Sequence, residues 1–260
     1  MSPSAHPHRV LIEACVDSVR SAQAALEGGA DRLELCSGLL EAGVTPSLGL
    51  LEAIRTAVAL PVFVLIRPRG GDFLYDPHEV AAMIRDIQRA KTAGAAGVVL
   101  GALTAKGEVD RSITQRLIDA ARPLPVTFHR AFDLTRDPDE TLETLMEMSV
   151  DRVLTSGQAP TAWDGQALIR AMVEAVDGTP VILAGGGIAA PHVRELVRVT
   201  GVTEIHLRGA TVTASEMIFR RPGIPLGKPP EGDTYIRAET SADRVRQIVA
   251  ALNGSGDEPR

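Results

Sequence analysis

The chain has 260 residues, of which 45% are hydrophobic and only 3% aromatic, and its 27 basic and 33 acidic side chains leave a net charge of −6. It contains no block of basic residues, no run of 18 apolar residues, no apolar signal core at its start and only two cysteines. These features argue against nucleic-acid binding, membrane insertion and a secreted disulfide framework, so we expect a cytoplasmic protein with an aliphatic core.

Aliphatic runs and helix-like stretches alternate along the chain after a polar tail at 1–8, which we expect to be disordered. Runs of Val, Ile and Leu predict buried parallel strands at 10–16, 32–37, 62–67, 97–103, 126–128, 152–157, 180–187 and 203–209. Helices are expected at 18–28, 47–59, 77–93, 110–121, 138–148, 165–176, 191–199 and 242–252. Eight strand–helix units predict one (β/α)8 TIM barrel over 9–253, and this count argues against the alternative of a doubly wound open sheet.

One internal segment does not fit the alternation. Residues 210–241 are rich in proline and glycine and have no clear periodicity, so we expect an irregular extension before the closing helix. The segment carries more apolar side chains than a free loop would, namely Met217, Ile218, Phe219, Ile224 and Tyr235. We therefore expect it to pack on the barrel or on a second subunit. Residues 254–260 are expected to form a disordered tail.

Carboxylates and thiols lie at the ends of the first two strands. Glu13 shares a strand face with Cys15, and Glu34 shares one with Cys36, because side chains alternate across a strand. Neighbouring strands are about 4.8 Å apart, so these four groups can converge if the shared face points inward. A buried carboxylate needs a cation, a metal or a proton. A structural ion network with Arg67 or Arg130 and ordinary packing of the thiols are the alternatives to a functional site.

The fifth strand ends in His129, Arg130 and Asp133, within the sequence PVTFHRAFD. TIM barrels hold their active sites at the C-terminal strand ends, which favours a catalytic role for these side chains. In that interpretation His129 or one glutamate transfers protons, and Arg67 holds an anionic group. The candidate catalytic residues are Glu13, Glu34, Arg67, His129 and Asp133. The alternative is a satisfied core histidine beside a surface ion pair of Arg130 with Asp133.

The last strands end in groups that suit an anion. Loops after the seventh and eighth strands of TIM barrels often bind phosphate through backbone N–H groups. The candidate anion-binding residues are Ser156, Gly185, Gly186, Gly187 and His206. The glycines could instead serve only to allow tight packing between strand and helix.

Six stretches of the chain form a recognisable set: VDS (16–18), GGADRLELC (28–36), GVTPSLG (43–49), IRPRGGDFLY (66–75), TFHRAFD (127–133) and LTSGQ (154–158). They resemble the CutC family of copper homeostasis proteins, and the resemblance extends over about 11–223. It implies a TIM barrel, a cytoplasmic location, a homodimer or higher homo-oligomer, and affinity for Cu(I). Cys15 and Cys36 match the cysteines linked to copper in that family. The chain departs from the family at Arg208, where a small residue is expected, and Arg208 would either strengthen an anion site or obstruct it.

Two functions follow from these observations. The first, which the resemblance implies, is copper homeostasis through Cu(I) bound by Cys15 and Cys36, since soft thiolates select that ion. The second is an enzyme that performs acid–base chemistry on a small anionic metabolite, phosphorylated metabolites included. Neither one implies an organic cofactor.

Overall fold

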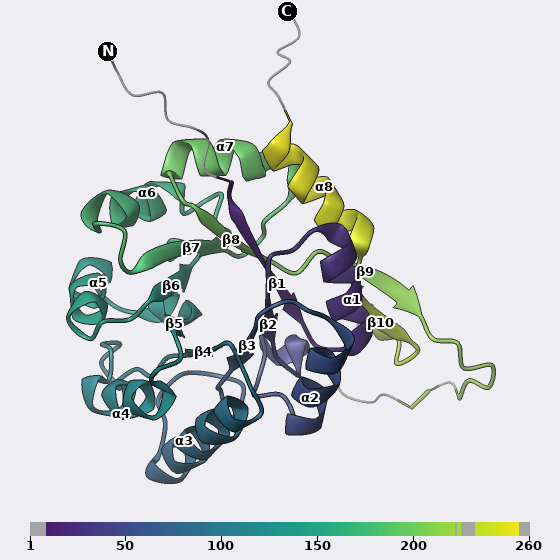
Figure 1. Ribbon diagram of the computed structural model, residues 1–260, viewed down its shortest axis with the longest axis horizontal. Helices are drawn as coiled ribbons and strands as arrows, with labels where there is room; N and C mark the ends of the chain where they lie inside the picture. Colours follow the sequence, from purple (N-terminus) through teal and green to yellow (C-terminus); the bar gives the residue numbers. More distant parts are fainter. Residues whose placement is uncertain (1–8, 222, 225–231, 255–260) are drawn as a thin grey trace, which may run out of the picture.

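The computed structural model describes residues 9–221, 223–224 and 232–254, so the predicted tails at 1–8 and 255–260 lie outside the described residues. Eight parallel strands pair in chain order and close into a barrel, with the helices around the outside (Figure 1). The strands are β1 (Leu11–Val16), β2 (Arg32–Leu35), β3 (Val62–Leu65), β4 (Gly97–Leu100), β5 (Val126–Phe128), β6 (Arg152–Thr155), β7 (Val181–Gly185) and β8 (Glu204–Leu207). This architecture confirms the predicted TIM barrel, although most strands end earlier than predicted.

Side chains cap the starts of the first five helices. They are α1 (Val19–Gly28), α2 (Leu48–Ala57), α3 (Pro77–Thr92), α4 (Arg111–Ala121), α5 (Pro138–Glu147), α6 (Gln166–Ala175), α7 (Ala190–Thr200) and α8 (Ala242–Asn253), with short 3-10 turns η1 (Leu39–Glu41) and η2 (Arg130–Leu134). Asp76 and Glu79 form a capping box at the start of α3, which satisfies backbone N–H groups that have no partner inside the helix. The longest helix, α3, has 16 residues, and no helix in the described part is long and apolar enough to cross a membrane.

A layer of charged side chains lies inside the barrel near the N-terminal ends of the strands. Arg32 of β2 pairs with Glu13 of β1, and its other end lies 2.7 Å from a carboxylate oxygen of Glu204. Arg152 contacts the same oxygen at 3.0 Å. The guanidinium of Arg32 also stacks over the ring of Phe63 at 4.8 Å. The cation that balances Glu13 is therefore Arg32, and not Arg67 or Arg130 as the sequence suggested.

The segment 210–241 is more regular than predicted. Strands β9 (Ala210–Ala214) and β10 (Ile236–Thr240) form a two-stranded antiparallel sheet beside the barrel, next to α1 (Figure 1). Hydrogen bonds from the backbone N–H of Thr240 to Ser21 and from Ser241 to the carbonyl of Gly209 tie this sheet to the barrel. The expectation of an irregular segment is wrong only at 210–214 and 236–240, because a period-two pattern in a short, exposed strand has no buried face to mark it.

Candidate functional site

A cavity of about 550 Å³ opens at the C-terminal ends of the barrel strands. The candidate residues that line it are Cys15, Glu34, Arg67, His129, Asp133, Gly186, Gly187 and His206. Four other candidates lie outside its wall: Glu13, Cys36, Ser156 and Gly185. Strand ends far apart in the sequence thus converge on one site, as TIM-barrel geometry requires.

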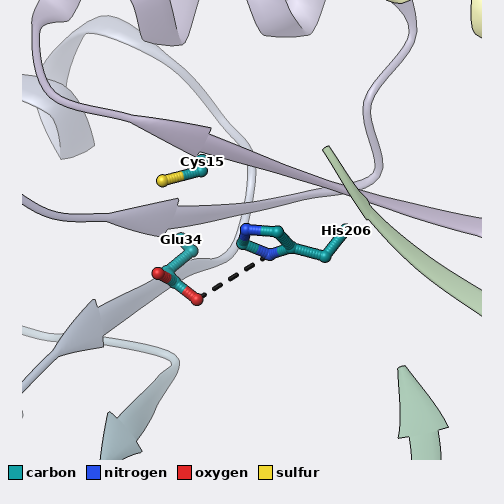
Figure 2. Close-up of side chains that lie close together, drawn as sticks. All are labelled: Cys15, Glu34 and His206. Carbon is teal, nitrogen blue, oxygen red and sulfur yellow. Dashed lines mark ion pairs between the residues drawn. The ribbon is translucent and has the colours of Figure 1, made fainter. Parts of the chain in front are cut away.

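Three side chains meet at one wall of this cavity (Figure 2). Cys15 of β1, Glu34 of β2 and His206 of β8 each offer a ligand atom, and these atoms lie within 4.8 Å of one another. His206 Nδ1 is 2.8 Å from a carboxylate oxygen of Glu13 and 3.8 Å from one of Glu34. This oxygen of Glu34, Oε2, is buried and accepts no hydrogen bond among the described residues, so it is available to a ligand.

The charges in this cluster separate the pKa values of its members. Burial would raise the pKa of Glu13, but the hydrogen bond from His206 and the charge of Arg32 outweigh it and lower the pKa to about 2. Burial and the charge of Glu13 raise the pKa of Glu34 to about 7, against the attraction of His206. Burial disfavours a charged His206, yet the carboxylates of Glu34 and Glu13 raise its pKa well above the usual value. Near neutral pH Glu13 is an anion, His206 is a cation and Glu34 is close to half-protonated.

The two cysteines lie close together but differ in access. Their Sγ atoms are 3.3 Å apart, and both thiols are free. Cys15 lines the cavity, whereas Cys36 is fully buried with its Sγ near the carbonyl of Val16. The hydrogen bond with Cys36 and burial raise the pKa of Cys15 well above its usual value, so this thiol stays protonated at neutral pH.

A linear two-thiolate copper site does not fit these positions. With metal–sulfur distances of about 2.3 Å, two opposed thiolates would stand about 4.6 Å apart. The observed 3.3 Å separation is too short for an ion in line between Cys15 and Cys36. The donor set that does surround a common point consists of Cys15, Glu34 and His206.

Arg67 braces the loops around the cavity. Its terminal nitrogens donate to the carbonyls of Glu41 and Gly43 at 2.7 Å each and to the carbonyl of Gly71 at 2.5 Å. The guanidinium also stacks on Phe73 at 4.9 Å. Because three carbonyls occupy its terminal nitrogens, Arg67 is poorly suited to the anion-binding role that the sequence suggested.

Asp133 also has a positioning role. Its carboxylate accepts hydrogen bonds from Thr155 Oγ1, from the backbone N–H groups of Ser156 and Gln158, and from Arg130 Nε at 2.7 Å. Arg130 reaches Ser156 Oγ at 2.8 Å as well. Asp133 therefore joins η2 to the loop after β6, and together with Ser156 it fixes the direction of Arg130.

Arg130 is absent from the catalytic and anion-binding residues predicted from the sequence, although it stands beside two of them at the end of the fifth strand. Its side chain is 45% exposed and lines the cavity. It lies beside Gly186, where an added Cβ would stand 3.4 Å from an Arg130 nitrogen. The signal that could have identified Arg130 was its presence in the same FHRAFD stretch as His129 and Asp133.

Gly186 and Gly187 connect β7 to the start of α7. Their φ angles are 97° and 70°, a backbone region that favours glycine. Backbone N–H groups before a helix start suit an anion, and these two residues share the cavity wall with Arg130. Gly185 instead packs in the strand, since an added Cβ would be 2.6 Å from Leu154.

The sequence of the chain matches a known family over most of its length. The profile of the CutC family matches residues 10–211. This chain belongs to the CutC family. It is 45% identical over 240 residues to the human "Copper homeostasis protein cutC homolog", covering 92% of this chain and 88% of that protein. It is 48% identical over 239 residues to the family protein CutC of Histophilus somni, covering 92% and 96% of the two chains.

A solved CutC structure from Streptococcus agalactiae has the same fold. Its TM-score to this chain is 0.73 at 30% sequence identity, and the match covers 76% of this chain and 98% of that one. The CutC match at 10–211 includes all eight barrel strands and every residue named above as lining the cavity. Arg208, where the resemblance led us to expect a small residue, also lines the cavity and donates to the carbonyl of Ala238 in β10 at 3.2 Å. It thereby links the barrel mouth to the β9–β10 sheet.

Proposed function

We propose that the cavity at the barrel mouth is the active site of an enzyme that transfers protons on a small anionic metabolite. The observation that carries this proposal is geometric. A carboxylate oxygen of Glu34 that accepts no hydrogen bond among the described residues shares a cavity of about 550 Å³ with His206, Arg130 and the Gly186–Gly187 turn. This volume suits a small metabolite and exceeds what a single ion needs.

Glu34 is the group best suited to accept and return a proton. It is 5% exposed, lines the cavity and keeps one oxygen without a hydrogen-bond partner among the described residues. Its raised pKa of about 7 agrees with that role, because proton transfer is most efficient when the pKa lies near the working pH. Glu13 and Arg32 lie beneath the cavity and hold His206 in place.

Arg130 and the glycine turn would bind the anionic group. Asp133 and Ser156 hold the guanidinium of Arg130 at the edge of the cavity, so little ordering is needed when an anion arrives. Gly186 and Gly187 allow the backbone to approach that anion closely. The proposed site therefore has a proton-transfer end at Glu34 and an anion-binding end at Arg130.

Inorganic phosphate provides a first test of the anion-binding end. At ten times its Kd, phosphate should stabilise the protein by about 1.4 kcal/mol, which corresponds to a Tm increase of about 3 to 6 °C. Arg130→Gln should abolish the shift, while Arg170→Gln, on the exposed face of α6, should keep it. A shift that survives in Arg130→Gln would contradict this assignment.

The reaction itself can be tested by proton NMR on panels of anionic metabolites with three to six carbons. We expect protein-dependent conversion of at least one compound, lost in Glu34→Gln and kept in Glu52→Gln, which changes an exposed carboxylate on α2. Conversion at an unchanged rate in Glu34→Gln would remove Glu34 as the proton-transfer group. No conversion by the native protein would argue against the enzyme.

A second function, Cu(I) binding, is favoured by the cluster of Cys15, Glu34 and His206. Thiolate and imidazole ligands suit Cu(I), and copper would here be the cargo of a homeostasis protein. Binding must release the protons that Cys15 and His206 hold through their raised pKa values, so affinity should increase with pH.

An anaerobic Cu(I) competition titration distinguishes this cluster from a two-thiolate site. If the cluster binds copper, Cys15→Ser abolishes one-to-one binding and Cys36→Ser keeps it. If both substitutions abolish binding, the two cysteines hold copper together, as the sequence suggested. Weak binding without defined stoichiometry in the native protein would argue against copper as the cargo.

We also propose a cytoplasmic, oligomeric protein. Two free thiols 3.3 Å apart would persist in a reducing compartment, which supports the cytoplasm. Ile218 and Phe219 are highly exposed for apolar side chains, which supports burial against a second subunit. Light scattering should find a dimer or larger oligomer that Phe219→Asp weakens, and a monomeric native protein would contradict this proposal.

A further inference from the structure

His129 carries a hydrogen-bond donor that none of the roles above uses. Its Nδ1 accepts the backbone N–H of Ala131 at 3.2 Å, at the start of η2. In a neutral imidazole one nitrogen accepts and the other carries the proton. The hydrogen bond from Ala131 therefore fixes the proton of His129 on Nε2.

The ring of His129 is held firmly in the cavity wall. Its centroid is 4.6 Å from that of Phe73, and Phe128 packs at 6.1 Å. On another side the ring lies against Gly101, where an added Cβ would be only 2.7 Å from Nδ1 and Cε1. A ring enclosed in this way has one orientation, so Nε2 keeps a constant position.

Nε2 of His129 is buried and has no partner within the described ranges. A buried donor without a partner is destabilising, and buried polar groups are rarely left in that state, so this group calls for an explanation. His129 lines the same cavity as Glu34 and Arg130. An acceptor atom of a bound substrate would provide the missing partner.

We propose that His129 donates its Nε2–H to a carbonyl oxygen of the substrate and stabilises the negative charge that develops there. The inference rests on the proposed function and names the substrate class as a small anionic carbonyl compound. Glu34 takes the proton from the carbon next to the carbonyl. The electrons of that C–H bond form a carbon–carbon double bond, and the carbonyl π electrons move to the oxygen held by His129. When that carbon carries a hydroxyl group, Glu34 returns the proton to the former carbonyl carbon and the hydroxyl proton passes to the oxygen held by His129. The carbonyl and hydroxyl groups thus exchange places, and the product is an isomer in which atoms and charges balance.

The electrostatics of the ring agree with a neutral donor. Burial and the positive charge of Arg67 lower the pKa of His129 to about 3. A neutral imidazole can still stabilise an oxyanion, because donors aimed at a developing charge act strongly in a site that excludes water. This role differs from the general base that the sequence suggested for His129.

Nitrogen-15 NMR of the ligand-free protein tests the tautomer directly. We expect His129 to show the pattern of a neutral ring protonated on Nε2, unchanged between pH 8 and pH 5. A proton on Nδ1, or a ring that becomes charged in this range, would overturn the inference without affecting the anion site at Arg130.

Two probes then separate the carbonyl site from the anion site. The carboxylate of 2-phosphoglycolate resembles the planar anion formed in the reaction, whereas inorganic phosphate offers only the charged group. We expect 2-phosphoglycolate, and not phosphate, to shift the Nε2 resonance of His129. If 2-phosphoglycolate binds through Arg130 and leaves this resonance unchanged, the inference is wrong and the anion site stands. If neither probe binds, the proposed function and the inference both fail.

Two substitutions of His129 provide a matched pair. His129→Asn keeps an acceptor for Ala131 but has no donor at the position of Nε2, and His129→Gln can present an amide N–H near that position. Losing one hydrogen bond to a charged group should weaken 2-phosphoglycolate binding about ten- to one-hundred-fold in His129→Asn, with phosphate binding unchanged. His129→Gln should recover part of the affinity. Equal affinity of the native protein and a folded His129→Asn would overturn the inference, and the NMR result decides if that variant does not fold.

Discussion

The raised pKa of Glu34 makes a quantitative prediction about stability. The pKa is 4.5 for an unperturbed glutamate and about 7 in this cluster, where burial and the charge of Glu13 favour the neutral form. Between these two values the folded chain binds more protons than the unfolded chain, so stability falls as the pH rises. Each pKa unit corresponds to 1.36 kcal/mol, and the full effect is about 3 kcal/mol.

Glu34→Gln removes this ionisation while keeping the shape of the side chain. Between pH 5 and pH 8.5, the free energy of unfolding of the variant should rise relative to the native protein by about 2 to 3 kcal/mol. In thermal unfolding the relative change in Tm should be about 4 to 12 °C. Other titrating groups affect both proteins and largely cancel in the difference.

Urea unfolding of the copper-free proteins at several pH values measures this difference. Glu52→Gln is the control, because Glu52 is exposed on α2 and its difference from the native protein should not change with pH. A constant difference for Glu34→Gln, or one that favours the native protein as the pH rises, would refute the reasoning. Glu34 would then be ionised throughout, and its assignment as a proton-transfer group near neutral pH would lose its electrostatic support.

Three further substitutions test the framework around the site. Arg32→Met leaves Glu13 and Glu204 buried without the cation that they share. We expect the free energy of unfolding, measured in urea, to fall by about 3–5 kcal/mol, and a fall below about 1 kcal/mol would contradict the role of this layer. Gly101→Ala places a Cβ against the His129 ring, so calorimetry should show that the free energy of unfolding falls by about 1–3 kcal/mol. NMR should show a displaced His129 ring, and an unchanged ring would disprove the contact. Asp133→Asn weakens the group that orients Arg130, so titration calorimetry should find weaker phosphate binding, and undiminished affinity would show that Arg130 needs no such partner.

Much of the barrel could be predicted from local patterns. The aliphatic strands, the capped helices and the polar residues at strand ends repeat along the chain, and each pattern depends on neighbouring residues alone. Helix starts such as Asp76–Glu79 follow from hydrogen bonds within four residues. The antiparallel sheet at 210–214 and 236–240 escaped prediction because its partner strands are 21 residues apart and only partly buried.

The roles of single side chains were harder to predict. Arg67 and Asp133 follow strand ends, where the active-site pattern places catalytic residues. Arg67, however, already donates hydrogen bonds to loop carbonyls, and Asp133 already accepts them from backbone N–H groups of another loop. Arg32 was overlooked because its partner Glu204 lies 172 residues away. Arg130 was assigned to an ion pair with Asp133, which exists, but the exposure of its guanidinium to the cavity depends on the loop after β6.

The sequence by itself determined the eight-fold alternation, the CutC pattern and the set of polar residues that reach the barrel mouth. These properties follow from side-chain periodicity and short-range hydrogen bonding, which act along the chain. Only the tertiary structure decided which of those residues are free to act on a ligand. Closure of the barrel brings β1 against β8, and this contact places His206 beside Glu13 and Glu34. The charge, burial and hydrogen bonding of each residue in that cluster depend on neighbours from several strands. They therefore cannot be predicted from any single stretch of the sequence.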